Sequence, residues 1–243
     1  MSLPHWDTHN RSVARSSAFL LEARRLGLLG PGPLEVHVQH SEAFLQALAR
    51  AWESSDVTLD TDFAPGPGEK GAARLLDLGS GGGVPGIVVA ELWPASRVAL
   101  VDSSKRRCAL LSGWVEEAGW TSRVTVLCGR AEELGRDPEL RSHFDAVLAR
   151  SFGRPAVTAE CAAPFLRVNG LLVVSDPPEP ETECPEDPLT DEPRWPPGPL
   201  RALGLEPHLT IRDPFHFTVL RQSGPCPDRY PRRTGIPSKR PLF

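Results

Sequence analysis

The sequence predicts an α/β fold, in which a doubly wound and mostly parallel sheet follows an N-terminal helical cap. Three observations lead to this prediction. From Ala72 onward, short apolar runs alternate with stretches of helical periodicity, as in strands joined by crossover helices. The first of these runs leads directly into a glycine-rich loop. Before about residue 70, by contrast, the apolar residues follow helical spacing alone.

The size and charge of the chain limit the kind of protein that it encodes. With 243 residues it can form one large domain or one domain with appendages, and its core needs no disulfide bonds. The 27 basic residues are outnumbered by 31 acidic residues, which gives a formal net charge of −4. This balance excludes an overall polycationic surface but leaves room for a local basic patch that binds a polyanion.

Two helices are expected in the N-terminal cap, at 12–27 and at about 36–52. Ser12 can cap the first helix. A Pro-Gly-Pro break separates the two helices, and the polar, Pro- and Gly-rich residues 53–71 indicate a linker. The predicted cap and linker together cover residues 1–70.

The predicted sheet lies in a domain that covers residues 71–222. Apolar runs of strand length alternate there with helical stretches, so right-handed crossovers should cover both faces of a parallel sheet. Strands are expected at 74–78, 98–102, 123–127, 144–149 and 170–174. Helices are expected between them at 86–92, 105–118 and 155–166. A pair of strands that closes the sheet is expected at 208–212 and 215–221.

Two charged segments accompany the end of the predicted sheet. Residues 176–199 are rich in proline and acid and cannot bury enough apolar surface to offset their ordering entropy, so we expect a mobile acidic loop. The tail, residues 223–243, is Pro-rich and basic. Its prolines keep the tail extended, so its cations can follow an RNA backbone, and a solvated, disordered end is the alternative. The candidate RNA-binding residues are Arg232, Arg233, Lys239 and Arg240.

The cysteines and the hydropathy indicate an intracellular protein. The cysteines are odd in number, widely spaced and without a Cys-x-x-Cys pair, which is typical of reduced thiols rather than of disulfide bonds or a zinc site. They are Cys108, Cys128, Cys161, Cys184 and Cys226. Residues 1–15 lack the apolar core of a signal peptide, and no apolar run approaches the roughly 20 residues that span a membrane. We therefore expect a cytoplasmic protein with no membrane partner and no bound metal.

The loop at 77–86 provides the first candidate site. Its glycines permit positive φ and let backbone amides approach a ligand at a helix N-terminus. Gly81-x-Gly83-x-x-Gly86 also matches the dinucleotide fingerprint, although a glycine-rich turn without a ligand can show the same pattern. Asp102 ends the next strand, where a carboxylate can accept hydrogen bonds from both hydroxyls of a ribose. Together these residues predict a nucleotide site at the carboxyl end of the sheet.

Two cofactors fit such a site, a nicotinamide dinucleotide and S-adenosylmethionine. Asp77, at the start of the loop, would repel a pyrophosphate but can face the cationic methionine end of S-adenosylmethionine. After the third strand, Ala131 and Glu132 are placed to reach an adenine ring, and an ordinary acid at a helix start is the alternative for Glu132. The combination favours S-adenosylmethionine, and hence a class I methyltransferase of Rossmann-like fold.

The fourth strand ends in Ala149-Arg150-Ser151-Phe152, which is not the Asn/Asp-Pro-Pro-aromatic motif of enzymes that methylate amino groups. Asp176-Pro177-Pro178 is similar to that motif but follows the fifth strand, so we interpret it as part of the acidic loop. Arg150 can donate two hydrogen bonds to a base, a carboxylate or a phosphate, and a structural salt bridge is the alternative. An acceptor with a free lone pair, such as guanine N7, needs alignment and no general base. Arg150 is therefore the candidate catalytic residue, and Phe152 and Trp195 are candidates for stacking on a flipped base, with ordinary packing as the alternative.

Five ordered segments resemble the bacterial 16S ribosomal RNA guanine-N7 methyltransferases, the GidB or RsmG family. They are Leu76–Gly86, Val101–Arg107, Gly129–Leu134, Ala149–Phe152 and Tyr230–Leu242. The resemblance implies methylation of guanine N7 in 16S ribosomal RNA with S-adenosylmethionine, and the small ribosomal subunit as partner; we expect a monomer. The family's cofactor contacts, carried over by position, fall on Gly79, Val84, Asp102, Ser103, Ser104, Ala131, Glu132 and Arg150. The candidate cofactor residues that the loop itself adds are Asp77, Gly81 and Gly83.

Parts of the chain depart from this family. The family's N-terminal Trp-Asn…Asn-Leu-Thr stretch is missing, and only His40 with Phe44-Leu45 is similar to its histidine-containing helix. Where the family has Leu-Lys-Gly after the fifth strand, this chain has Val174-Ser175-Asp176-Pro177-Pro178, which replaces a lysine by the start of an acidic loop. The alternatives are a diverged methyltransferase that acts on a small molecule or another RNA, a nicotinamide-dependent oxidoreductase, and a non-catalytic S-adenosylmethionine-binding RNA module.

Overall fold

The computed structural model describes residues 14–54, 72–177 and 193–243. Most of the linker expected at 53–71, most of the acidic loop expected at 176–199, and Cys184 lie outside the described residues. Within the described ranges, no helix combines the length and the apolar character that crossing a bilayer requires.

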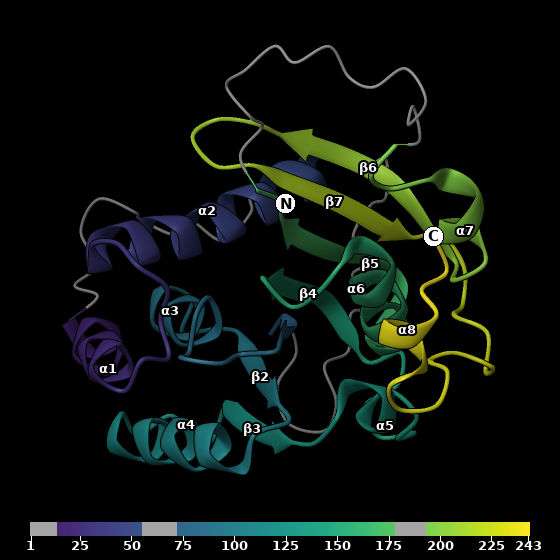
Figure 1. Ribbon diagram of the computed structural model, residues 1–243. Coiled ribbons are helices and arrows are strands. Elements are labelled where there is room, and N and C mark those ends of the chain that lie inside the picture. Colours follow the sequence, from purple (N-terminus) through teal and green to yellow (C-terminus); the bar gives the residue numbers. More distant parts are fainter. Residues whose placement is uncertain (1–13, 55–71, 178–192) are drawn as a thin grey trace.

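Among the described residues, seven strands form one sheet in the order β3-β2-β1-β4-β5-β7-β6 (Figure 1). The strands β1 to β5 are parallel where they pair, whereas β7 is antiparallel to both β5 and β6. The predicted doubly wound, mostly parallel sheet is therefore confirmed. The strands are β1 (Arg74–Leu78), β2 (Arg97–Asp102), β3 (Val124–Cys128), β4 (Phe144–Arg150), β5 (Leu166–Ser175), β6 (Leu205–Ile211) and β7 (Phe217–Gln222).

Helices cover both faces of the sheet because successive strand residues point to opposite faces. In β4, Ala146 and Leu148 belong to one apolar core, and Val147 and Ala149 belong to the other. The first core is completed by α1 (Ala14–Arg25), α2 (Leu34–Glu53), α3 (Gly86–Leu92) and α4 (Lys105–Glu117). The second core is completed by α5 (Ala131–Leu134), α6 (Pro155–Ala162), the 3-10 helix η1 (Ala163–Phe165) and α7 (Pro197–Arg201).

Helix α2 joins the N-terminal segment to the sheet. It contacts α3, β5 and β7, and Phe44 shares the first apolar core with Phe217 of β7, where the two ring centroids are 4.7 Å apart. The N-terminal helices therefore pack on the same face of the sheet as the crossover helices α3 and α4 (Figure 1). The division of the chain at residues 70 and 222 stays a prediction.

Several boundaries differ from the expectations. The helix expected at 155–166 ends at Ala162, and β5 begins at Leu166, several residues before the expected start. The early part of β5 carries a register shift opposite Phe144 and Ala146, which interrupts the apolar alternation that marks a strand in the sequence. The acidic loop is expected to extend to residue 199, but helix α7 already begins at Pro197. Proline is tolerated at this place because the N–H groups in the first turn of a helix have no partner within the helix, so the missing N–H of proline costs no hydrogen bond.

Candidate active site

A cavity of about 330 Å³ lies at the carboxyl ends of the parallel strands. It opens where the strand order reverses, because β1 pairs with β2 on one side and with β4 on the other. Ligands of doubly wound sheets bind at such a switch point. The predicted cofactor residues that line this cavity are Gly79, Asp102, Ser103, Ala131 and Glu132.

The loop after β1 depends on glycine for its shape. Gly79, Gly81 and Gly83 have φ values of 79°, 53° and 90°, in the left-handed region that other residues adopt only with strain. A Cβ on Gly79 would also fall 2.7 Å from Cδ2 of Phe152, which is closer than real Cβ contacts allow. The loop backbone therefore lies directly against the Phe152 ring at the edge of the cavity.

Asp102 holds the glycine loop and faces the cavity at the same time. Its Oδ2 accepts a hydrogen bond of 2.9 Å from the Gly81 amide, and its Oδ1 accepts one of 2.8 Å from the Ser104 amide. Ser104 in turn caps α4 by accepting a hydrogen bond from the Arg107 amide. Gly81 and Ser104, both predicted as cofactor residues, thus act on this cavity through Asp102 and do not line it.

Asp77 lies beneath the loop instead of lining the cavity. It is 1% exposed, and its Oδ2 accepts a hydrogen bond of 3.0 Å from the Gly86 amide at the start of α3. Burial raises the pKa of Asp77 to about 7, although hydrogen bonds from Ser80 and Gly86 and the charge of Arg150 oppose this shift. In the structure Asp77 is therefore a positioning residue for the loop. Gly83 and Val84 also pack away from the cavity, against Ile87 and the first core respectively.

The raised pKa of Asp77 predicts a distinctive pH dependence of stability. In the native state Asp77 keeps its proton up to about pH 7, whereas in the unfolded chain it releases the proton near its ordinary pKa of 3.8. Between these two pKa values the native state binds more protons than the unfolded chain does. The contribution of Asp77 to the free energy of unfolding therefore falls as the pH rises. Asp77→Asn cannot titrate and is expected to remove this fall.

Thermal unfolding of both proteins between about pH 4.5 and pH 8 measures the effect. As the pH rises, the melting temperature of Asp77→Asn should increase relative to the melting temperature of the wild type. Burial lowers the pKa of His40 to about 4, with the opposite sign of pH dependence, but this contribution is common to both proteins. Parallel melting curves across the pH range would show that Asp77 is ionised in the native state.

Glu132 connects the cavity to the C-terminal tail. Its Oε1 accepts a hydrogen bond of 3.0 Å from the Gly235 amide and one of 3.2 Å from Arg130. Burial alone would raise the pKa of Glu132, but hydrogen bonds from Gly235, its own amide and Arg130 outweigh burial and lower the pKa. Ser238, in the short helix α8 (Ile236–Lys239), also lines the cavity. The tail thus forms part of the cavity wall, and the sequence analysis missed Gly235 and Ser238.

The tail is folded against α6, which corrects the expectation of an extended segment (Figure 1). Arg232 forms an ion pair with Glu160 of α6, with Nη2 2.6 Å from Oε2 and Nε 2.9 Å from Oε1. Glu160 is fully buried, so Arg232 serves as its counter-charge, which favours a structural role for Arg232 over the predicted contact with RNA. Arg233, Lys239 and Arg240 are exposed and remain proposed RNA contacts.

Arg232→Ala is expected to destabilise the fold by about 3–5 kcal/mol, because it leaves the Glu160 carboxylate buried without its partner. Urea unfolding at neutral pH measures the loss. Arg233→Ala, which removes an exposed arginine next in the chain, is the matched control and should change stability by less than about 0.5 kcal/mol. Equal stabilities of the two variants would contradict the structural role of Arg232.

Arg150, at the end of β4, lies beside helix α2. Its Nη2 is 2.8 Å from Nδ1 of His37, and burial lowers the pKa of Arg150 while the charge of Asp77 opposes this. A guanidinium can only donate, so Nδ1 of His37 accepts this hydrogen bond, and burial together with the charge of Arg150 lowers the pKa of His37. The sequence analysis did not place His37 here, since the pairing joins residues 113 positions apart.

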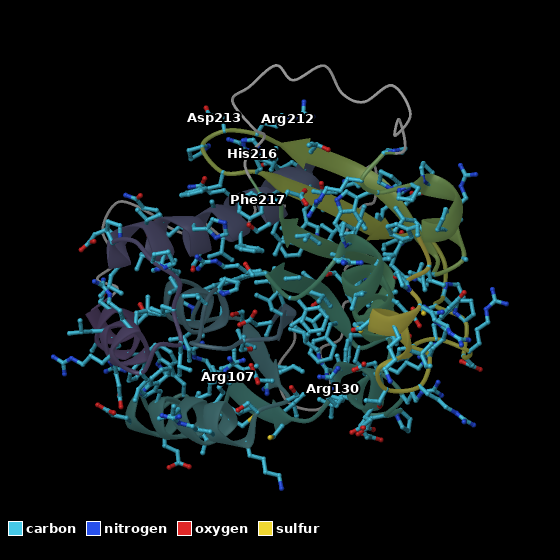
Figure 2. The ribbon with its side chains drawn as sticks, viewed as in Figure 1. Arg107, Arg130, Arg212, Asp213, His216 and Phe217 are labelled. Atoms are coloured by element: carbon cyan, nitrogen blue, oxygen red, sulfur yellow. The ribbon has the colours of Figure 1, made fainter. Side chains whose placement is uncertain are left out.

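A second cavity of about 440 Å³ adjoins the first. Arg150 and His40 line it, and Nε2 of His40 is 2.9 Å from the Ser175 hydroxyl at the end of β5. Ser151 and Phe152 line both cavities, so these two residues form their common wall. In Figure 2, Arg107 and Arg130 mark the first cavity at the lower centre, and His216 marks the second cavity beside β7. The two cavities therefore meet directly after β4.

Comparisons with known proteins show the family to which the chain belongs. The family model GidB, described as rRNA small subunit methyltransferase G, matches residues 67–188. A ribosomal RNA small subunit methyltransferase G from Prochlorococcus marinus is 34% identical over 183 residues, which cover 70% of this chain and 68% of that protein. One from Deinococcus radiodurans is 36% identical over 177 residues, which cover 71% of this chain and 67% of that protein.

Solved structures support the fold alone. A protein from Corynebacterium glutamicum is 14% identical, with a TM-score of 0.53, and the match covers 89% of this chain and 93% of that chain. A candidate O-methyltransferase from Klebsiella pneumoniae is also 14% identical, with a TM-score of 0.53, and the match covers 88% of this chain and 91% of that chain. The similarity of sequence decides the family: this chain belongs to the GidB family, that of the rRNA small subunit methyltransferase G.

Proposed function

We propose that this chain transfers the methyl group of S-adenosylmethionine to N7 of a guanine in 16S ribosomal RNA of the small ribosomal subunit. The observation that carries the proposal is the pair of adjoining cavities that share the Ser151–Phe152 wall, in a member of the GidB family. A methyl transfer needs a donor pocket and an acceptor pocket in direct contact, because the reaction is an in-line displacement between two bound molecules.

The residues of the first cavity fit the cofactor. Asp102 presents a carboxylate at the end of β2, where ribose hydroxyls can donate to it, and Ala131 and Glu132 lie where an adenine ring would be held. The volume of about 330 Å³ is within the range of small-molecule sites. S-adenosylmethionine supplies a methyl group on a positively charged sulfur. Arg150 lines the neighbouring cavity, so we assign it to the acceptor side rather than to the cofactor contacts.

The chain's own residues position the acceptor and exclude water. Guanine N7 carries a lone pair and no proton, so its methylation needs no general base. His40, which lines the acceptor cavity, has a pKa of about 4 because of burial and the nearby charge of Arg150. This pKa is far from the value suited to a base near neutral pH. The guanidinium of Arg150 orients the acceptor, and helix α2 shields the site.

The surface and the thiols support the proposed RNA binding and cytoplasmic location. Arg233, Lys239 and Arg240 are exposed on the tail segment that borders the cofactor cavity, and cations there can neutralise phosphates near the target base. The free thiols Cys108, Cys128, Cys161 and Cys226 support a reducing cytoplasmic location, where small subunits are available. We infer that the protein acts as a monomer, which gel filtration of the purified chain tests.

The function is tested with small ribosomal subunits from cells that lack this protein. The purified chain and labelled S-adenosylmethionine are added, and the 16S ribosomal RNA is digested to nucleosides for mass spectrometry. We expect 7-methylguanosine to form. A methyl group on another nucleoside would contradict the N7 assignment, and no transfer to the subunit or to its free RNA would contradict the substrate.

A further inference from the structure

The acceptor cavity contains a carboxylate that the methyl transfer itself does not need. Asp176 follows β5, lines this cavity, and has a side chain that is only 13% exposed. We propose that Asp176 selects guanine by accepting hydrogen bonds from the Watson–Crick edge of the target base. This inference rests on the proposed function and names the residue that decides which base is accepted.

Asp176 is fixed from three sides. Its amide donates to the His216 carbonyl at 2.9 Å, its Oδ1 accepts a hydrogen bond of 2.8 Å from Nε of Arg194, and its Oδ2 accepts one of 2.6 Å from the Thr218 hydroxyl. A carboxylate has about four acceptor positions, two on each oxygen. Each oxygen therefore uses one position in these contacts and keeps one for a ligand in the cavity. The result is a rigid acceptor with two neighbouring oxygens.

Guanine matches such a pair of oxygens. Its N1–H and N2 amino group are adjacent donors, whereas adenine presents N1 as an acceptor in the equivalent place. The N2 amino group lies on the minor-groove side of the base and N7 lies on the major-groove side. A guanine held by N1 and N2 on Asp176 therefore leaves N7 free to receive the methyl group.

Other groups around the cavity fit the same base. Phe152, Trp195 and Phe215 line it and offer aromatic faces, and enzymes that act on a flipped base hold it between such side chains. Trp195 and Arg150 also line the cavity, and their Nε1 and Nη1 atoms are buried donors that have no hydrogen-bond partner within the described residues. A rotation of the Trp195 ring would present its donor to guanine O6, an acceptor next to N1.

The position of the cavity also fits. Phe152 belongs to both cavities, and its ring lies against Gly79 of the cofactor loop. A base that enters the second cavity with its Watson–Crick edge on Asp176 turns its opposite edge away from Asp176 and towards this common wall. Recognition of the base and alignment of N7 are thus provided by different residues, Asp176 for the first and Arg150 for the second.

The test uses the full chain saturated with S-adenosylhomocysteine and measures the binding of GMP, IMP and AMP by saturation-transfer NMR. GMP should bind, IMP, which lacks the N2 amino group, should bind about fivefold or more weakly, and AMP should not compete with GMP. Asp176→Asn should weaken GMP binding at least about tenfold and remove the preference over IMP, with unchanged affinity for S-adenosylhomocysteine.

Two variants separate recognition from structure. Asp213→Asn removes an exposed carboxylate close to His216 on the β6–β7 connection and should leave GMP binding unchanged (Figure 2). Arg194→Gln removes one support of Asp176 but leaves Thr218 and the His216 carbonyl, so it should keep the preference for GMP. If Arg194→Gln abolishes the preference as fully as Asp176→Asn, the ion pair and not the carboxylate is responsible, and the inference is overturned.

Absence of GMP binding, or equal binding of GMP and AMP, also overturns the inference. A protein that gives either result but still methylates small-subunit RNA in a separate assay with S-adenosylmethionine retains the proposed function, so only the role of Asp176 is lost. A protein that fails to bind S-adenosylhomocysteine contradicts the proposed function itself.

Discussion

Replacing Arg150 with alanine is expected to reduce methyl transfer at least about a hundredfold, the size of effect seen when one preorganised polar group is removed from a reacting centre. Arg150 lines the acceptor cavity beside the Ser151–Phe152 wall, where the methyl group must pass. The fold should survive, because Asp77, the carboxyl group whose pKa the charge of Arg150 lowers, has a pKa of about 7 and can take up a proton when the arginine is absent. Turnover with labelled S-adenosylmethionine and the melting temperature measure the two effects.

Arg154→Ala is the matched control for this experiment. Arg154 is an exposed arginine four positions further along the chain, just before α6, and lies outside the set of residues that line either cavity. Arg150→Lys keeps the charge but loses the two-pronged donor, and it should recover only part of the activity if orientation of the acceptor is the main role. Equal activity of Arg150→Ala and Arg154→Ala would remove Arg150 from the site.

Replacing Asp102 with alanine is expected to weaken cofactor binding about a hundredfold or more. Each hydrogen bond to a charged group contributes about 1.5–3 kcal/mol, and this carboxylate is the proposed partner of two ribose hydroxyls. The substitution also releases the Gly81 and Ser104 amides, so the glycine loop loses its anchor. Calorimetric titration with S-adenosylhomocysteine measures the loss.

Two further variants make the Asp102 result specific. Asp102→Asn keeps one oxygen that can accept a backbone hydrogen bond, so it should bind the cofactor more tightly than Asp102→Ala and less tightly than the wild type. Asp137→Ala removes an exposed aspartate after α5 and should bind as the wild type does. If Asp102→Ala retained full affinity, the cavity at the end of β2 would not be the ribose site.

The sequence predicted the sheet and the cofactor loop because both depend on local patterns. Apolar runs identify β1 to β4, with small errors in the positions where the strands begin and end. Glycines are needed in the loop because its backbone adopts positive φ values. The place of Asp102 followed from the strand that it ends. Each of these features is decided by a few neighbouring residues.

The remaining parts of the site depend on contacts between distant residues. His37 reaches Arg150 across 113 positions, and Arg232 reaches Glu160 across 72 positions. Read alone, Arg232 belongs to a basic tail suited to RNA, and only the fold shows that a buried carboxylate already neutralises it. Asp176 was interpreted as loop for the same reason, since its partners Arg194 and Thr218 come later in the chain.

The position of helix α2 has a consequence for protein engineering. Because Phe44 packs against Phe217 while His37 from the same helix contacts Arg150, one helix supports the sheet and the acceptor side together. Residues 34–53 therefore cannot be exchanged for another protein's N-terminal segment as an independent module. A graft that repacks the apolar face of α2 would also displace the His37 imidazole from Arg150. The methyl-transfer activity and the cooperativity of unfolding should therefore change together.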